Sequence, residues 1–84
     1  MASTVTVLAF AGAREILGVE TLPLTLPSPR LKASEVLDTL CQHYPELADY
    51  RSCLKLAVNG RYARMDEPVC HGDEVALIPP VAGG

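Results

Sequence analysis

The sequence has 84 residues and is 49% hydrophobic, which suits one small domain and is too apolar for a disordered chain. Seven basic and ten acidic side chains leave a net charge of −3, which argues against nucleic acid as the main partner, because such partners need a basic face. No apolar run is long enough to span a membrane, and residues 1–4 do not resemble a secretory signal. We therefore expect neither nucleic-acid nor membrane binding.

The cysteines Cys41, Cys53 and Cys70 are odd in number and widely spaced. This pattern favours free thiols over a disulfide framework, and free thiols are typical of a reducing compartment. We therefore expect the protein to reside in the cytosol.

The first half of the chain predicts two strands, a short helix and a long helix. Thr4–Phe10 is rich in β-branched residues and reads as a strand whose core-facing residues are Val5, Val7 and Ala9. Ala11–Leu17 follows as a short helix, with Ala13, Ile16 and Leu17 on one side and Gly18 as its C-terminal stop. Glu20–Leu26 alternates again with Leu22, Leu24 and Leu26 inward, and Pro23 places this strand at a sheet edge.

The main helix follows a loop at residues 27–30. Ser34 is the predicted N-cap, Glu35 lies in the first turn, and Pro45 ends the helix. Its apolar face is formed by Val36, Leu37, Leu40, Cys41 and Tyr44.

The second half predicts three more strands. Residues 46–53 read as a polar, irregular segment that can include one short helical turn, and Leu54, Leu56 and Val58 alternate as a strand. Asn59-Gly60 is a strong hairpin signal, after which Tyr62 and Ala63 begin the return strand. His71, Gly72 and Asp73 form another turn before the last strand, Glu74–Ile78.

This order predicts an α+β fold: a mixed sheet of four or five strands packed on one main helix. We place the single domain at residues 1–78 and an extended C-terminal tail at residues 79–84.

The tail consists of Pro79, Pro80, Val81, Ala82, Gly83 and Gly84. The two prolines keep the segment extended and outside any sheet, and six residues reach roughly 20 Å. Glycine has no Cβ, so a Gly-Gly carboxylate can enter a narrow slot. The tail is therefore either a chemical handle or a frayed end, and its composition alone leaves both interpretations open.

The first and last strands are expected to lie side by side and parallel. Their outward residues would then be Leu8, Phe10, Ala76 and Ile78, an apolar patch at the base of the tail. Contiguous exposed apolar surface usually marks a partner site. The alternative is that a neighbouring loop covers these residues.

Two segments make the chain resemble a known family: LAFAGAREILG at residues 8–18 and GDEVALIPPVAGG at residues 72–84. Both are similar to the MoaD family, the small, sulfur-carrying subunits of molybdopterin synthase. The resemblance implies a β-grasp, ubiquitin-like fold. It also implies that a ubiquitin-activating-type adenylyltransferase uses ATP to adenylate Gly84, and that a sulfur donor protein then converts the acyl-adenylate to a thiocarboxylate.

The resemblance further implies a partner, the large catalytic subunit of molybdopterin synthase, in a heterotetramer with two copies of each chain. The tail would enter the large subunit's active site and pass sulfur to cyclic pyranopterin monophosphate. By this resemblance the chain is a carrier and no enzyme on its own, and it binds no cofactor or metal. Phe10 and Ile78 stand at positions like the family's interface residues. We also assign Arg14 to this interface, although the simplest interpretation of Arg14 is a solvated helix face. Ala82 replaces the Ser or Thr that is frequent in relatives.

Other chemistry is weakly supported by the sequence. Cys41 and His43 stand two apart on a helix and do not face each other, so a catalytic dyad is not expected. Cys70-His71 lacks the paired spacing of a zinc site, and three cysteines are too few for an iron–sulfur cluster. Lys55, Arg61 and Arg64 form a possible basic strip on the hairpin, for which partner contact and plain solvation stay open.

Three other classes of protein are also compatible with a Gly-Gly C-terminus. A thiazole-pathway sulfur carrier also ends in Gly-Gly but lacks the Pro-Pro step. A ubiquitin-like modifier would be joined to lysines of target proteins. An interaction module would use the patch and leave its tail inert.

Overall fold

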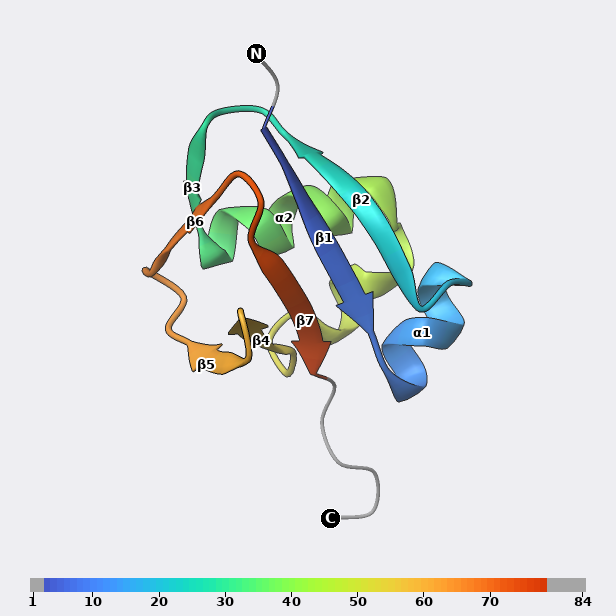
Figure 1. The fold of residues 1–84 in the computed structure, drawn as a ribbon. Coiled ribbons are helices and arrows are strands. Elements are labelled where there is room, and N and C mark those ends of the chain that lie inside the picture. The colour runs from blue at the N-terminus through green and yellow to red at the C-terminus, as the bar shows by residue number, and fades with distance from the viewer. Residues whose placement is uncertain (1–2, 79–84) are drawn as a thin grey trace.

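The computed structural model describes residues 3–78, which form the helices and strands shown in Figure 1. The strands are β1 (Ser3–Ala9), β2 (Thr21–Leu26), β3 (Arg30–Lys32), β4 (Lys55–Val58), β5 (Arg61–Ala63), β6 (Pro68–Cys70) and β7 (Glu74–Ile78). The helices are α1 (Ala11–Leu17), α2 (Ala33–His43) and the 3₁₀ helix η1 (Pro45–Tyr50).

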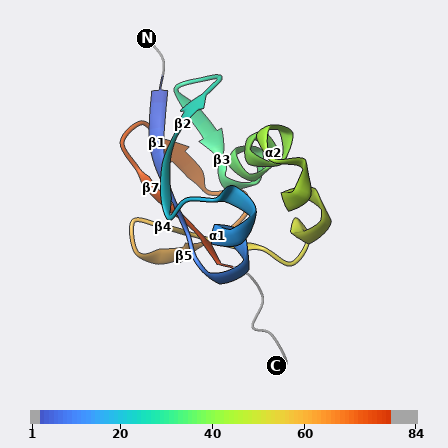
Figure 2. The same cartoon turned by 90° about the vertical axis from the view of Figure 1, so that its right-hand side faces the viewer.

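Five strands form one mixed sheet in the order β2-β1-β7-β4-β5. β1 and β7 run parallel, and the other neighbouring pairs are antiparallel. Helix α2 covers one face of this sheet, so the molecule has two layers (Figure 2). The predicted mixed sheet on one main helix, with its first and last strands adjacent and parallel, is confirmed.

The core lies between the sheet and α2 and follows the predicted alternation. In β1 the inward residues Val5, Val7 and Ala9 are at most 2% exposed, and Val75 and Leu77 of β7 are fully buried. From the helix, Val36, Leu37 and Leu40 are fully buried, while Cys41 and Tyr44 pack against the core from its margin. Strand periodicity of two and helix periodicity of 3.6 therefore placed the apolar residues correctly.

Three glycine-containing turns were also predicted correctly. Gly18 ends α1 with a left-handed φ of 78°, a conformation that costs glycine no steric penalty. Asn59 (φ 51°) and Gly60 (φ 89°) form the tight turn between β4 and β5, and Gly72 has φ 88° before β7. Pro23 stands in β2, an edge strand of the sheet, where a missing N–H breaks no ladder.

Two predictions near the start of α2 are wrong. Arg30 does not belong to a loop: it begins β3, which pairs with β6 in a separate two-stranded sheet that the sequence analysis missed. Ser34 is not the N-cap, because the helix begins at Ala33 and Lys32 takes the cap position. The backbone N–H of Ser34 donates to the Met65 carbonyl (2.9 Å), so a distant segment satisfies this donor.

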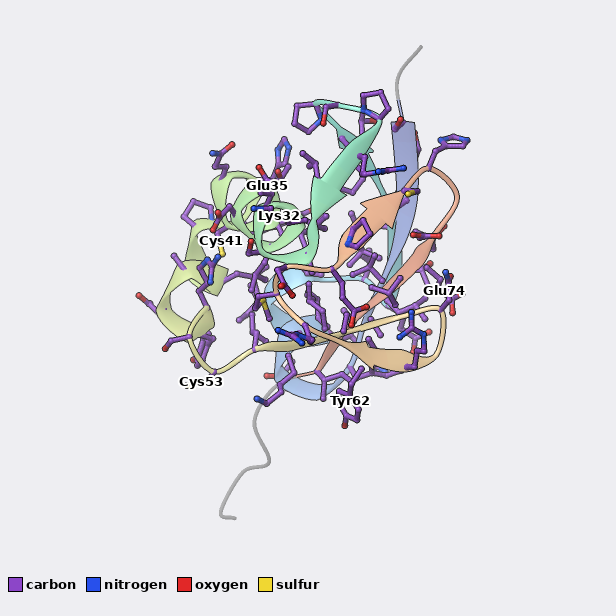
Figure 3. The ribbon with its side chains drawn as sticks, turned by 90° about the vertical axis from the view of Figure 1, so that its left-hand side faces the viewer. Lys32, Glu35, Cys41, Cys53, Tyr62 and Glu74 are labelled. Atoms are coloured by element: carbon purple, nitrogen blue, oxygen red, sulfur yellow. The ribbon has the colours of Figure 1, made fainter. Side chains whose placement is uncertain are left out.

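Glu35 lies in the first turn of α2, as predicted, and it stabilises the start of the helix. Glu35 accepts a hydrogen bond from the Lys32 backbone N–H at 2.8 Å, which closes the start of α2. Figure 3 shows the two residues together at this end of the helix.

The segment after α2 contains the short helical turn that the sequence suggested. Pro45 ends α2 as expected but also begins η1, and Leu47 within η1 is fully buried. Within residues 46–53, Leu47 is therefore the buried residue of a mostly exposed segment. None of the helices between residues 3 and 78 is long and apolar enough to cross a bilayer.

Candidate partner-binding site

The face of the five-stranded sheet opposite α2 carries the predicted apolar patch. Leu8 of β1 stands in register with Ala76 of β7, and Ala76 stands opposite Ala57 of β4. Ala57 in turn faces Tyr62 of β5. The row Leu8–Ala76–Ala57–Tyr62 therefore crosses four strands, because residues in register share one face of a sheet.

Ile78 and Phe10 extend this row toward the carboxyl ends of β1 and β7. Ile78 is the last residue of β7 and, like Ala76, points away from the buried Leu77. Phe10 follows β1 with an extended backbone (φ −126°, ψ 153°) and is 53% exposed. We call these six residues the outer patch: Leu8, Phe10, Ala57, Tyr62, Ala76 and Ile78.

No element among residues 3–78 covers the outer patch (Figure 1). Ala57 is buried at 9% exposure, Leu8, Ala76 and Ile78 are half-buried by their neighbours within the sheet, and Phe10 and Tyr62 are exposed. The alternative that a neighbouring loop covers the predicted residues is therefore wrong for the described chain. An apolar surface of this kind is a candidate for binding a partner protein.

The sequence analysis missed Ala57 and Tyr62 as members of the outer patch, and Tyr62 is the more exposed of the two. Tyr62 is 67% exposed, the largest exposed fraction of any large apolar residue in the described part of the chain. The signal was present, since a two-residue turn at Asn59-Gly60 fixes Val58 opposite Arg61 and hence Ala57 opposite Tyr62.

A hollow of about 270 Å³ adjoins the patch where β1 ends and β2 begins. Its lining residues are Leu8, Ala9, Phe10, Arg14, Glu20 and Thr21. At its rim Arg14 Nη1 donates to Glu20 Oε1 at 2.9 Å, and both side chains are largely exposed. Arg14, which we predicted at the interface, therefore lies beside the patch with a carboxylate partner of its own. Such an exposed pair adds little to stability, so it is available for exchange with a partner's charges.

The predicted tail, Pro79–Gly84, lies outside the described residues. The residue to which the tail is attached is described: β7 ends at Ile78, within the outer patch and between β1 and β4. Any segment that continues from Ile78 therefore starts beside this surface.

The other candidate residues have structural explanations. Burial raises the pKa of the Cys41 thiol, which Arg51 lowers and Asp38 raises by smaller amounts, so Cys41 is a poor nucleophile. His71 Nδ1 accepts the Thr4 backbone N–H (3.0 Å), and Asp73 accepts the Cys70 N–H (2.8 Å), which fixes the turn before β7. Within residues 3–78 no three metal-ligating side chains converge, and all three cysteines are free thiols.

The sheet order, the parallel pair of the first and last strands (β1 and β7) inside the sheet, and the helix packed across one face define a ubiquitin-like β-grasp protein. The crystal structure of SAMP1 from Haloferax volcanii, a small archaeal modifier protein, superposes with a TM-score of 0.82 at 27% identity, over 96% of this chain and 99% of that one.

Sequence comparison narrows the class. The ThiS family matches residues 7–84. The molybdopterin synthase sulfur carrier subunit of Arabidopsis thaliana is 45% identical over 93% of this chain and 80% of its own length. The corresponding subunit of Aedes aegypti is 41% identical over 95% and 88%. The chain therefore belongs to the ThiS family and, within it, to the MoaD family.

Proposed function

We propose that this chain is the sulfur carrier subunit of molybdopterin synthase. The observation that carries the proposal is the 45% identity to the Arabidopsis thaliana sulfur carrier subunit over nearly the whole chain. The match to the ThiS family extends through residue 84, so it includes the Gly-Gly segment.

The chemistry centres on Gly84. A free carboxylate is a poor acyl electrophile, so an adenylyltransferase of the ubiquitin-activating type first joins it to AMP from ATP and releases pyrophosphate. Sulfide supplied by the donor protein attacks the acyl carbon, the bond to the AMP oxygen breaks, AMP leaves, and a thiocarboxylate remains. Gly83 and Gly84 leave this carbon unhindered, because neither carries a Cβ.

The large subunit supplies the catalysis. In the proposed heterotetramer it binds the outer patch and receives Pro79, Pro80, Val81, Ala82, Gly83 and Gly84 in its active site. Sulfur passes to cyclic pyranopterin monophosphate, and water returns Gly84 to the carboxylate. A dithiolene contains two sulfur atoms and each tail delivers one, so two deliveries complete it. The chain needs no cofactor of its own for this role, and its free thiols fit a place in the cytosol.

Intact mass spectrometry tests the proposal. The purified chain is incubated with ATP, the activating enzyme and a sulfide source, and its mass should rise by the difference between one sulfur and one oxygen atom. A matched chain extended by one residue beyond Gly84 is the control and should not change. An unchanged mass of the unextended chain in the presence of a competent activating enzyme would contradict the proposal.

A second candidate function is that of a ubiquitin-like modifier, favoured by the similarity to SAMP1. Both functions use an activated C-terminal glycine, but a modifier forms isopeptide bonds with lysines of other proteins. Mass spectrometry of digested cell extracts separates the two, because a modifier leaves a branched remnant on lysine.

Two other functions have tests of their own. A thiazole-pathway carrier would restore thiazole synthesis in cells that lack their own carrier. An interaction module with an inert tail would lose no function when residues 83–84 are deleted.

A further inference from the structure

The sequence suggested a basic strip of Lys55, Arg61 and Arg64 on the hairpin. The structure does not place these three residues in one strip. Arg61 pairs with Glu67 at 3.7 Å and Arg64 pairs with Asp66 at 3.4 Å. Arg61 also differs from Lys55 in its place in the sheet, since Arg61 stands opposite the core residue Val58. Two of the three predicted members therefore have acidic partners of their own.

Lys55 is different in position and in partners. It is exposed and stands directly opposite Ile78 in the β4–β7 ladder, so its side chain lies on the outer face where β7 ends. Among residues 3–78, four of the seven basic side chains pair with carboxylates, and Lys55 is not one of them. The other two outside these pairs, Arg30 and Lys32, lie on β3 in the separate two-stranded sheet.

The nearest acid on the same face of β7 is too far away to neutralise Lys55. Glu74 stands at the start of β7, opposite Thr6, and Ile78 stands at its end. Four residues of extended chain separate these positions by roughly 13 Å. This separation exceeds the Debye length of about 8 Å at physiological ionic strength. Figure 3 shows Glu74 on the sheet side of the molecule, opposite the helical side that carries Cys41 and Cys53.

From this placement we infer that Lys55 is a recognition residue for the large subunit, which presents a carboxylate beside the entrance for the tail. The inference rests on the proposed function, because it takes the outer patch as the surface that the large subunit covers. The aliphatic stem of Lys55 continues the apolar surface beside Ile78, and its ammonium stands at the edge of the patch. A cation at the rim of an apolar interface accelerates association and fixes orientation more than it adds contact area.

Binding measurements with three variants test the inference. Lys55→Met keeps the apolar stem and removes the charge, and Lys55→Glu reverses the charge. Arg30→Glu is the matched control, because it changes the net charge by the same amount as Lys55→Glu on another surface. The dissociation constant for the purified large subunit is measured at low and high salt, and thermal unfolding checks that each variant is folded.

We expect Lys55→Met to weaken binding about two- to fivefold at low salt, as for an exposed ion pair, and to match the wild type in about 1 M salt. Lys55→Glu should weaken binding about tenfold or more at low salt. Arg30→Glu should bind like the wild type. If Lys55→Met binds normally at low salt, or if Arg30→Glu is as impaired as Lys55→Glu, the inference is wrong.

Including Phe10→Ala in the same experiment separates the inference from the proposed function. Loss of binding in Phe10→Ala with normal binding of both Lys55 variants would overturn the role of Lys55 and leave the docking surface in place. If even the wild-type chain does not bind the large subunit, the proposed function fails and the role of Lys55 fails with it.

Discussion

Phe10 offers the sharpest test of the outer patch, because about half of this residue is exposed and that half makes no contact that stabilises the monomer. Its exposed fraction is 53%, and its neighbours Leu8 and Arg14 line the adjoining hollow. A buried phenylalanine removes about 200 Å² from water, so a partner that covers the exposed half buries about 100 Å² more. At about 25 cal/mol per Å², this contact contributes about 2.5 kcal/mol to the complex.

Phe10→Ala should therefore weaken binding to the large subunit by about 70-fold at most. Tyr50→Ala is a matched control, because Tyr50 is another half-exposed aromatic (49%) and lies at the end of η1, outside the sheet. Both variants lose a similar buried area within the monomer, so their free energies of unfolding should fall by comparable amounts. Only the Phe10 variant should lose affinity.

Isothermal titration with the large subunit, beside urea unfolding of each variant, measures both quantities. The reasoning is refuted if Phe10→Ala binds within twofold of the wild type, or if Tyr50→Ala is weakened to the same degree.

Three further predictions address the tail, the core and the thiols. Gly83→Ala should slow thiocarboxylation of Gly84 without changing the unfolding midpoint, because a misplaced acyl group is costly to the reaction; equal sulfur loading by intact mass would contradict this. Leu47→Ala should lower the free energy of unfolding by about 2–5 kcal/mol in urea titrations, since Leu47 is fully buried, and a loss below about 1 kcal/mol would show that the site collapses freely. At mildly alkaline pH iodoacetamide should modify exposed Cys53 before Cys41, because burial raises the pKa of Cys41 and so keeps more of its thiol protonated; peptide mapping that finds Cys41 first would disprove this order.

The sheet was predictable from the sequence because its signals are local. Alternating apolar residues in β1 and β7 specify one buried face, and Asn59-Gly60 specifies the turn that orders β4 and β5. Most of the outer patch followed from the same alternation once β1 and β7 were placed side by side. Tyr62 required one further step, which was to carry the register across the turn.

The features that were missed depend on distant segments. β3 and β6 have three residues each, and such short strands show no periodicity before they meet. The start of α2 moved away from Ser34 because Glu67 and Met65 carbonyls accept the N–H groups of Ala33 and Ser34. A side-chain cap was therefore unnecessary, and no local pattern could reveal this.

The position of β7 has a mechanical consequence for a protein that is held by its end. β7 is the central strand of the sheet, bonded to β1 on one side and to β4 on the other. A pull directed along β7 from Ile78 loads both ladders in shear, so many hydrogen bonds resist together instead of parting one after another. In the proposed function, a partner that grips the tail would therefore pull on a strand that is hydrogen-bonded on both sides.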